Sequence, residues 1–215
     1  MTKKDHLLGI IAGLFIGLLA MPVVHTVKPG LYGSLSWAIL PFFLIATPLG
    51  LIVAHWIGKK ISVVWQIGKF GVIGVLNTLV DWGVLTALIL FFRSYYAIDP
   101  EAAMVSIGTA IITYYTVYKS TSFIVAVINS YYWNKYWTFA TGVATKTRAE
   151  FVQFFLVSVI GFFINVGLAS YIFKAIAPIG GMNPDQWGLM GAAIGSIAGL
   201  AWNFIGYKFV VFKNV

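Results

Sequence analysis

The sequence contains no cysteine, three histidines and only six acidic residues among its 215. Without cysteine, disulfide bonds and thiolate metal sites are excluded. The histidines (His6, His25 and His55) form no pair at metal-ligand spacing on one helix. Charged residues make up 9% of the chain, whereas soluble domains average roughly 25%. So little charge excludes a sizeable soluble domain and predicts an integral membrane protein.

Hydrophobic residues make up 60% of the chain, and the mean hydropathy is +0.91. A membrane-spanning helix needs about 20 mostly apolar residues. The net charge of +8 is carried by basic residues that flank the apolar runs, which is typical of membrane topology signals. We therefore expect no nucleic-acid partner. The sequence predicts six spans, at residues 7–24, 37–57, 67–92, 122–137, 151–177 and 187–212.

Three segments between or before these spans need separate predictions. The first span follows Lys3-Lys4 as in a signal peptide, but residues 19–22 lack a small-residue cleavage site, so we expect it to be retained. Residues 61–65 are predicted to lie at the membrane interface. Residues 103–117 are predicted to form an interfacial or re-entrant helix, with a long helix projecting outward as the alternative. Lys119 is then expected to reach toward the outer interface.

The distribution of basic residues predicts cytoplasmic N- and C-termini, because cytoplasmic loops carry an excess of lysine and arginine. Ten basic residues fall inside and four outside in this orientation. The inner set is Lys3, Lys4, Lys59, Lys60, Lys69, Lys135, Lys146, Arg148, Lys208 and Lys213, and the outer set is Lys28, Arg93, Lys119 and Lys174.

Asn77 and Asp81 are polar residues in the middle of the third apolar run. They lie four residues apart, so a helix places them on one face. A carboxyl group within hydrocarbon costs roughly 2.5 kcal/mol or more, which predicts a partner or a polar cavity for Asp81. Three roles remain open for it: an ion pair with a lysine, a hydrogen bond to a substrate hydroxyl, or proton coupling.

Spans three and four are similar to spans five and six. The segment that begins at Lys69 aligns with the one at Gln153, which places Gly161 opposite Asn77 and Asn165 opposite Asp81. Residues 130–139 align with residues 203–212, and each copy ends in an aromatic residue after a lysine. We therefore predict an all-α membrane fold in which an N-terminal hairpin precedes a four-helix core of two parallel repeats. The ridge Gly191, Gly195 and Gly199 is predicted to serve helix packing.

Two motifs carry a resemblance to a known family. The pattern Phe70-x3-Gly74-x2-Asn77-Thr78-x2-Asp81 resembles the opening motif of the GtrA-like family, and residues 129–139 resemble its second-span signature. The resemblance implies a four-span domain at residues 65–215, preceded at residues 1–64 by a hairpin that typical members lack. Dimerisation, partner docking and lateral lipid access are the roles left open for this hairpin. Tyr207 departs from the pattern, because an asparagine is often found there.

The resemblance also implies a function. Members are thought to flip polyprenyl-phosphate-linked monosaccharides from the cytoplasmic to the outer leaflet of the bacterial cytoplasmic membrane, often beside a membrane glycosyltransferase. The alternatives are a scaffold for such an enzyme and a small proton-coupled exporter. We expect no enzymatic activity, metal or cofactor, and we leave a homodimer open.

The residues predicted to bind this substrate combine amides, lysines and one carboxyl group. Amides both donate and accept hydrogen bonds, which suits sugar hydroxyls, and lysines suit a phosphate. The predicted amides are Asn77, Asn129, Asn134, Asn165 and Asn203, the lysines are Lys69, Lys135 and Lys208, and the carboxyl group is that of Asp81.

Overall fold

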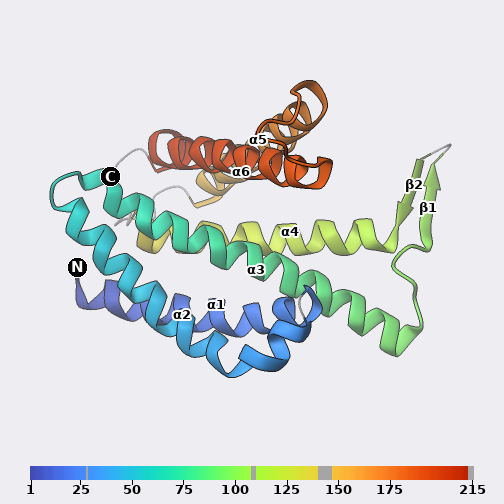
Figure 1. The fold of residues 1–215 in the computed structure, drawn as a ribbon, viewed down its shortest axis with the longest axis horizontal. Coiled ribbons are helices and arrows are strands. Elements are labelled where there is room, and N and C mark those ends of the chain that lie inside the picture. The colour runs from blue at the N-terminus through green and yellow to red at the C-terminus, as the bar shows by residue number, and fades with distance from the viewer. Residues whose placement is uncertain (28, 108–109, 140–146, 213–215) are drawn as a thin grey trace. The chain divides into compact units, whose positions relative to one another are not determined.

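The computed structural model describes residues 1–27, 29–107, 110–139 and 147–212, so Lys28, Lys146 and Lys213 lie outside the described residues. Helices dominate the fold (Figure 1), as an all-α membrane protein requires. The elements are α1 (Lys3–Val27), α2 (Pro29–Gly58), α3 (Ser62–Tyr96), β1 (Ala103–Ile107), β2 (Ala110–Thr113), α4 (Tyr114–Trp133), the π-helix η1 (Asn134–Thr138), α5 (Thr147–Ala175), α6 (Pro184–Gly206) and the π-helix η2 (Tyr207–Val211).

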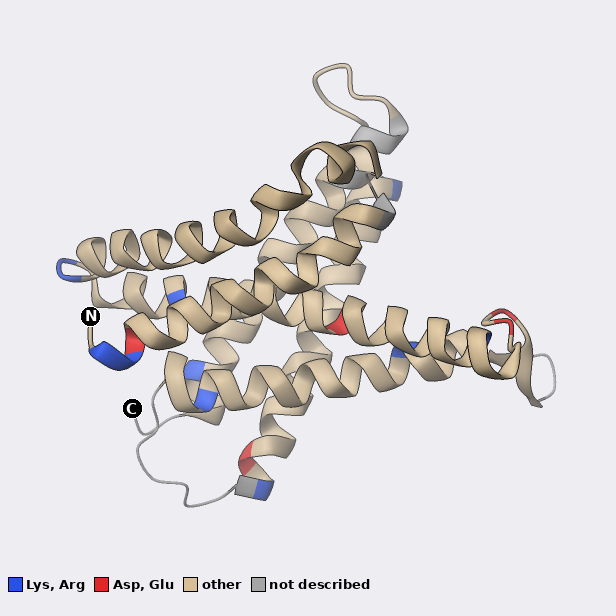
Figure 2. Cartoon of the chain, turned by 90° about the horizontal axis from the view of Figure 1, so that it is seen from below, with Lys and Arg blue, Asp and Glu red and all other residues tan. Residues whose placement is uncertain are grey.

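Within the described ranges, five helices are long and apolar enough to cross a membrane: α1, α2, α3, α5, and α6 continued into η2. Figure 2 shows that the charged residues lie mostly toward helix ends and leave long uncharged stretches between them. The chain is therefore a multi-pass membrane protein. The remaining predicted span corresponds to α4, which is helical but more polar than the others, so its crossing of the membrane stays a prediction.

The chain divides into two compact units, Met1–Thr138 and Phe139–Val215. The first unit contains α1 to α4, the two strands and η1, and the second contains α5, α6 and η2. The division between a hairpin at residues 1–64 and a domain at residues 65–215 is based on family resemblance, and it stays a prediction.

A glycine ridge on α1 brings this helix close to α2. Gly9, Gly13 and Gly17 are spaced four residues apart, and a Cβ atom at Gly13 would lie 2.5 Å from the carbonyl oxygen of Phe43 on α2. Small residues let helix backbones approach closely in membranes, where no hydrophobic effect drives association. The N-terminal hairpin is thus held together by the same kind of motif that the sequence predicted for the last span.

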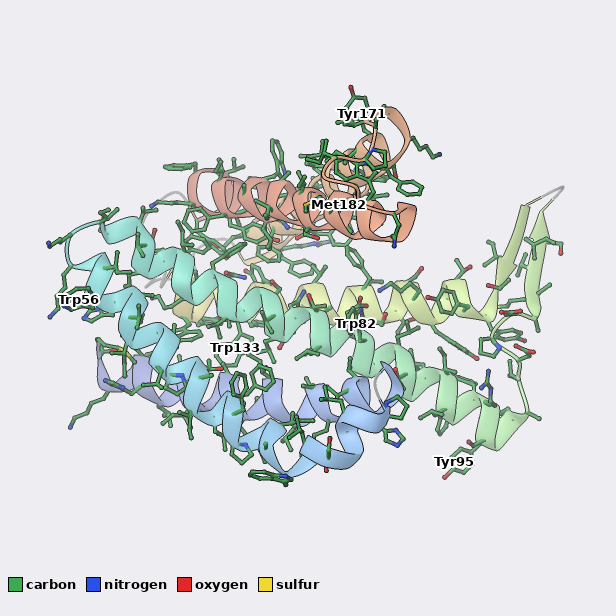
Figure 3. All side chains as sticks on the ribbon, viewed as in Figure 1. Trp56, Trp82, Tyr95, Trp133, Tyr171 and Met182 are labelled. Atoms are coloured by element: carbon green, nitrogen blue, oxygen red, sulfur yellow. The ribbon has the colours of Figure 1, made fainter. Side chains whose placement is uncertain are left out.

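The core of the first unit joins this hairpin to α3. Its buried residues come from four elements: Ala12, Ile16 and Ala20 from α1, Leu51 from α2, Ile73, Leu76 and Leu79 from α3, and Trp137 from η1. Figure 3 labels Trp133, whose side chain packs against this cluster. The N-terminal hairpin is therefore an integral part of the first unit.

The prediction of a helix at residues 103–117 is wrong. Ala103–Ile107 and Ala110–Thr113 form an antiparallel hairpin in which Val105 pairs with Ile112, and it stands at the start of α4 (Figure 1). These strands are rich in β-branched residues, which favour extended structure over helix. The Thr113 side chain then accepts a hydrogen bond from the Thr116 backbone N–H and caps α4.

The short turn predicted at residues 61–65 is not separate from the third span, because α3 already begins at Ser62. The position of these residues at the membrane interface stays a prediction. With 35 residues, α3 is about 52 Å long at about 1.5 Å per residue, which exceeds the roughly 30 Å hydrocarbon layer. Its C-terminal residues include Tyr95, which is exposed (Figure 3). We conclude that α3 crosses the hydrocarbon layer and continues beyond it or tilts.

In the second unit, the glycine ridge of α6 packs against α5, which confirms its predicted role in packing. A Cβ atom at Gly199 would lie 2.8 Å from the carbonyl oxygen of Gly161, and one at Gly195 would overlap the carbonyl oxygen of Asn165. Trp187 adds a second fastening, since its indole N–H donates to the Ile176 carbonyl near the end of α5 over 2.9 Å. The α5–α6 hairpin therefore depends on close backbone approach.

Gly195→Ala should destabilise the protein, because the new methyl group has no space beside the Asn165 carbonyl. Overpacking of this kind costs about 1–3 kcal/mol. The matched control is Gly167→Ala, since no atom lies within 4 Å of a Cβ atom at Gly167. Both variants gain helix propensity equally, so thermal unfolding in detergent isolates the packing term. A Gly195→Ala protein that melts at or above the Gly167→Ala temperature would contradict this packing.

Candidate functional site

Four helix ends meet at one end of the first unit. The amino group of Met1 lies 2.6 Å from Nε2 of His55, which joins the start of α1 to the end of α2. The Lys4 ammonium donates to the Tyr136 carbonyl oxygen over 3.0 Å, which joins α1 to η1. The start of α3 is bound here too, through Lys69. This end is the one that the basic residues predict to be cytoplasmic.

Trp137 is the residue on which these helix ends converge. Its indole N–H donates to Asp5 Oδ1 over 3.0 Å, and its carbonyl oxygen accepts from the Lys69 ammonium over 2.8 Å. The other Asp5 oxygen accepts hydrogen bonds from the backbone N–H and the hydroxyl of Thr2, at 2.9 and 2.7 Å. All three of Asp5, Lys69 and Trp137 are buried. The carboxylate of α1 and the ammonium of α3 therefore hold η1 from two sides.

The π-helix η1 carries two of the predicted site residues, Asn134 and Lys135, and both are fully buried. The Lys135 ammonium donates to the Tyr131 hydroxyl over 3.0 Å and lies 5.3 Å from the centre of that ring. Asn134 donates to the Ser130 carbonyl over 2.8 Å. Within the described part of the chain, Asn134 Oδ1 and Thr138 Oγ1 are buried with no hydrogen-bond partner. This segment therefore holds a cation beside acceptors that remain available.

The equivalent lysine of the second repeat also sits in a π-helix. Asn134–Thr138 and Tyr207–Val211 are separated by a constant offset of 73 residues, and each has its lysine in second position. The sequence alignment of the two repeats places the same residues opposite one another. A π-helix is rare and is often found at functional sites. The shared distortion supports the predicted internal repeat.

Asn77 of α3 and Asn129 of α4 face each other. Asn129 Nδ2 and Asn77 Oδ1 are 3.5 Å apart, at the outer limit of a hydrogen bond, and both residues are partly exposed. Asn77 lies four residues before Asp81, on the same face of α3. The two predicted amides are therefore together, in a contact at the outer limit of a hydrogen bond.

Asp81 forms an ion pair, so one of its three predicted roles is observed. Its carboxylate accepts hydrogen bonds from the Lys119 ammonium and, over 2.6 Å, from the Ser122 hydroxyl. Ser122 is fully buried, whereas the Lys119 side chain is 41% exposed and that of Asp81 17%. Lys119 is thus an ion-pair partner within the bundle. Its predicted reach toward the outer interface stays a prediction.

In the second unit, the predicted amides serve mainly in packing. Asn165 contacts Gly195 and Gly199, and the Asn203 amide fits against Gly161, where any side chain would overlap it. The Lys208 ammonium lies over the rings of Phe204 and Phe209, at 5.8 and 5.6 Å. Tyr207, which departs from the family pattern, shares a 2.7 Å hydrogen bond with Ser158 and stacks on Phe154.

The structure thus gathers part of the predicted site within the first unit. Asn77, Asp81 and Asn129 lie along facing surfaces of α3 and α4, and Asn134 and Lys135 follow in η1. Sequence reasoning missed Asp5, Lys119 and Ser122 as partners of these residues. Ser122 lies three residues after Lys119, on one helical face, which is a signal that could have found this pair. No local sequence pattern points from Asp5 to Trp137.

A family model described as GtrA/DPMS, transmembrane domain, matches residues 69–212. The chain belongs to this family. A relative is the uncharacterized membrane protein YngA of Bacillus subtilis (strain 168), which is 30% identical over 125 residues, covering 54% of this chain and 70% of the relative. No solved structure matches the chain at a significant level.

The GtrA/DPMS match begins at Lys69 and ends at Phe212, so it contains every residue of the predicted site. Helices α1 and α2 lie outside it. Helix α1 nevertheless contacts the matched region at residues 136 and 137, through Lys4 and Asp5. A helix outside the family match therefore supports η1 directly.

Asp5→Ala should destabilise the protein by about 1–3 kcal/mol, because it leaves the buried Trp137 indole N–H without an acceptor. Asp5→Asn, which keeps one oxygen, should lose less, and Lys3→Ala at an exposed neighbour should change little. Thermal unfolding in detergent provides the measurement. In a Trp137→Phe background the effect of Asp5→Ala should be clearly smaller. An equal loss in both backgrounds would show that Asp5 does not act through Trp137.

Proposed function

We propose that this protein moves a polyprenyl-phosphate-linked monosaccharide from the cytoplasmic to the outer leaflet of a bacterial cytoplasmic membrane. The observation that carries the proposal is the pair of facing polar surfaces on α3 and α4. Asn77 meets Asn129 there, and Asp81 meets Ser122 and Lys119. The contacts are partly exposed, so the surfaces are not sealed from their surroundings.

The chemistry of such a substrate explains why a polar surface is needed. Its charged head must cross hydrocarbon, and an unpaired ion or unsatisfied hydroxyl there costs several kcal/mol. Amides and hydroxyls along α3 and α4 replace the hydrogen bonds that water would provide. The prenyl chain has no such need and remains in the lipid. A helix pair with one polar seam therefore lowers the barrier for the head alone.

Lys135 is proposed to receive the phosphate at the cytoplasmic end. Its ammonium donates to the Tyr131 hydroxyl of α4, and the buried Thr138 hydroxyl of the same π-helix has no partner in the described structure and is able to donate to a phosphate. Lys69 is proposed to act indirectly, by holding η1 in place, since its ammonium already donates to the Trp137 carbonyl oxygen. Asn77, Asn129 and Asn134 are proposed to bind sugar hydroxyls.

The second repeat is proposed to contribute less directly. Lys208 keeps a partly exposed ammonium and remains a proposed phosphate contact of its own hairpin. Asn165 and Asn203 lie against glycines of the α5–α6 contact, so their first role is packing. We retain Asn203 as a sugar contact, because its buried Oδ1 has no hydrogen-bond partner in the described structure.

Orientation and partners follow from the proposal. The four helix ends that meet around Trp137 would lie at the cytoplasmic face, together with Lys3, Lys4, Lys59 and Lys60. A membrane glycosyltransferase that makes the lipid-linked sugar would be the natural partner, and synthesis inside with consumption outside would drive net movement. A scaffold for that enzyme is the main competing function. A proton-coupled exporter is less well supported, because Lys119 and Ser122 already occupy the Asp81 carboxylate.

Purified protein in liposomes should transfer a labelled polyprenyl-phosphate glucose between leaflets, measured by exposure of the sugar to a membrane-impermeant reagent. Lys135→Gln should slow transfer about tenfold or more, because it removes a charge-assisted contact to phosphate. Lys135→Arg should retain most of the rate. Lys60→Gln, at an exposed lysine in the α2–α3 loop, is the matched control. Folded wild-type protein that transfers no lipid but binds the glycosyltransferase would favour the scaffold.

A further inference from the structure

The Asp81–Lys119 pair is built asymmetrically. The Asp81 carboxylate is fixed by Ser122, a buried residue on α4, and is itself mostly covered. The Lys119 side chain is more than twice as exposed as that of Asp81, at 41% against 17%. Its ammonium is carried by a flexible four-carbon stem. The carboxylate therefore stays in place when the pair opens, while the ammonium is able to turn toward another anion.

Lys119 also occupies a distinctive position along α4. It precedes Lys135 by 16 residues, which corresponds to about 24 Å of helix at about 1.5 Å per residue. The hydrocarbon layer is roughly 30 Å thick. In the predicted topology, Lys119 of α4 and Lys135 of η1 therefore place one ammonium group near each boundary of that layer. Ser122 and Asn129 lie between the two lysines, on the face of α4 that meets α3.

We propose that Lys119 is the outer-leaflet binding residue for the phosphate of the lipid carrier, and that the Lys119 ammonium pairs with the Asp81 carboxylate whenever no phosphate is bound. The proposal rests on the proposed function and adds a second phosphate site to it. Binding would be an exchange, in which the phosphate oxygens replace the Asp81 carboxylate on Lys119. Release would be the reverse exchange.

An exchange of anions solves an electrostatic problem of the outer site. A lone ammonium within or near hydrocarbon is costly, so an empty site without Asp81 would be disfavoured or would hold its phosphate too tightly. With Asp81 present, Lys119 has an anionic partner both before and after release. Asp81 in turn keeps the Ser122 hydroxyl as a donor when Lys119 leaves it. The pair therefore weakens phosphate binding where the lipid must depart.

Among the described residues, the other basic residues predicted on the outer side lack this arrangement. Arg93 and Lys174 lie in the last turns of α3 and α5, and both are exposed. Arg93 follows Asp81 by 12 residues, about 18 Å along the same helix at about 1.5 Å per residue, so it is too distant to serve the Asp81 carboxylate. Lys174→Gln is accordingly a matched control that removes one outer positive charge without touching the pair.

The test is equilibrium binding of polyprenyl monophosphate to full-length protein in detergent. Lys119→Gln should weaken binding about tenfold, and Lys119→Arg should stay within about threefold of wild type. Asp81→Asn removes the competing carboxylate and should tighten binding by about threefold or more. Lys174→Gln should bind like wild type. Opposite signs for Lys119→Gln and Asp81→Asn distinguish competition from a purely structural ion pair, whose loss would weaken binding in both variants.

Each outcome decides the proposal. Asp81→Asn protein that binds no more tightly than wild type overturns it, as does equal binding by Lys119→Gln and wild type. If Asp81→Asn does not fold, the contrast between Lys119→Arg and Lys119→Gln decides instead, with Asp81→Glu expected to bind like wild type. Inorganic phosphate is the second probe, and binding as strong as that of the lipid would overturn the assignment to a carrier.

The same variants in the liposome assay separate this proposal from the proposed function. Wild-type transfer together with unaltered binding in the Lys119 variants would refute the outer site alone. The expected binding pattern without any transfer by wild-type protein would refute transport and leave a phosphate-binding site.

Discussion

The first unit depends on the way Trp137 is held between two opposite charges. Asp5 accepts a hydrogen bond from its indole N–H, and Lys69 donates one to its carbonyl oxygen. Each charged group would be costly alone in a buried position, but here each one satisfies a polar group of the same tryptophan. Because Asp5 belongs to α1 and Lys69 to α3, one residue fixes the position of η1 relative to both helices. Lys135, which follows Asn134 in η1, is thereby held in place as well.

This arrangement gives the N-terminal hairpin a role that its place outside the family match would not suggest. Within the hairpin, the glycine ridge of α1 packs against α2. Lys4, Asp5 and several apolar residues of the hairpin then contact the rest of the unit. A π-helix is rare and found mostly as a single turn, which indicates that it needs support from outside its own backbone. In η1 that support comes from side chains of α1 and α3. In η2 it comes from Ser158 and Phe154 of α5, which hold Tyr207.

Much of the helical architecture could be predicted from the sequence, because apolar length, flanking charge and glycine spacing are local properties. The ridge at Gly195 and the repeat that aligns Lys135 with Lys208 are examples. The helix prediction for residues 103–117 failed because apolar composition alone does not distinguish a β-hairpin from a helix. The β-branched residues at 105, 107, 111 and 112 favour strands and were the better guide. The turn predicted at residues 61–65 is instead the start of α3, because the exact residue at which a helix begins is poorly determined by apolar pattern. The partners of Asp81 and Trp137 were not predictable in the same way, because they depend on which helix faces meet.

The two repeats use their aligned polar positions differently. In the first, Asn77 and Asp81 of α3 face polar residues of α4, and the contacts remain partly open. In the second, the positions aligned with them are Gly161 and Asn165, and both lie in the tight contact with α6. A glycine at the first of these positions permits the backbones to approach, but it gives up an amide that could bind a ligand. The α3–α4 hairpin, whose polar contacts are partly exposed, is therefore better suited to bind a substrate. The α5–α6 hairpin, with its glycine ridge, is better suited to tight helix packing.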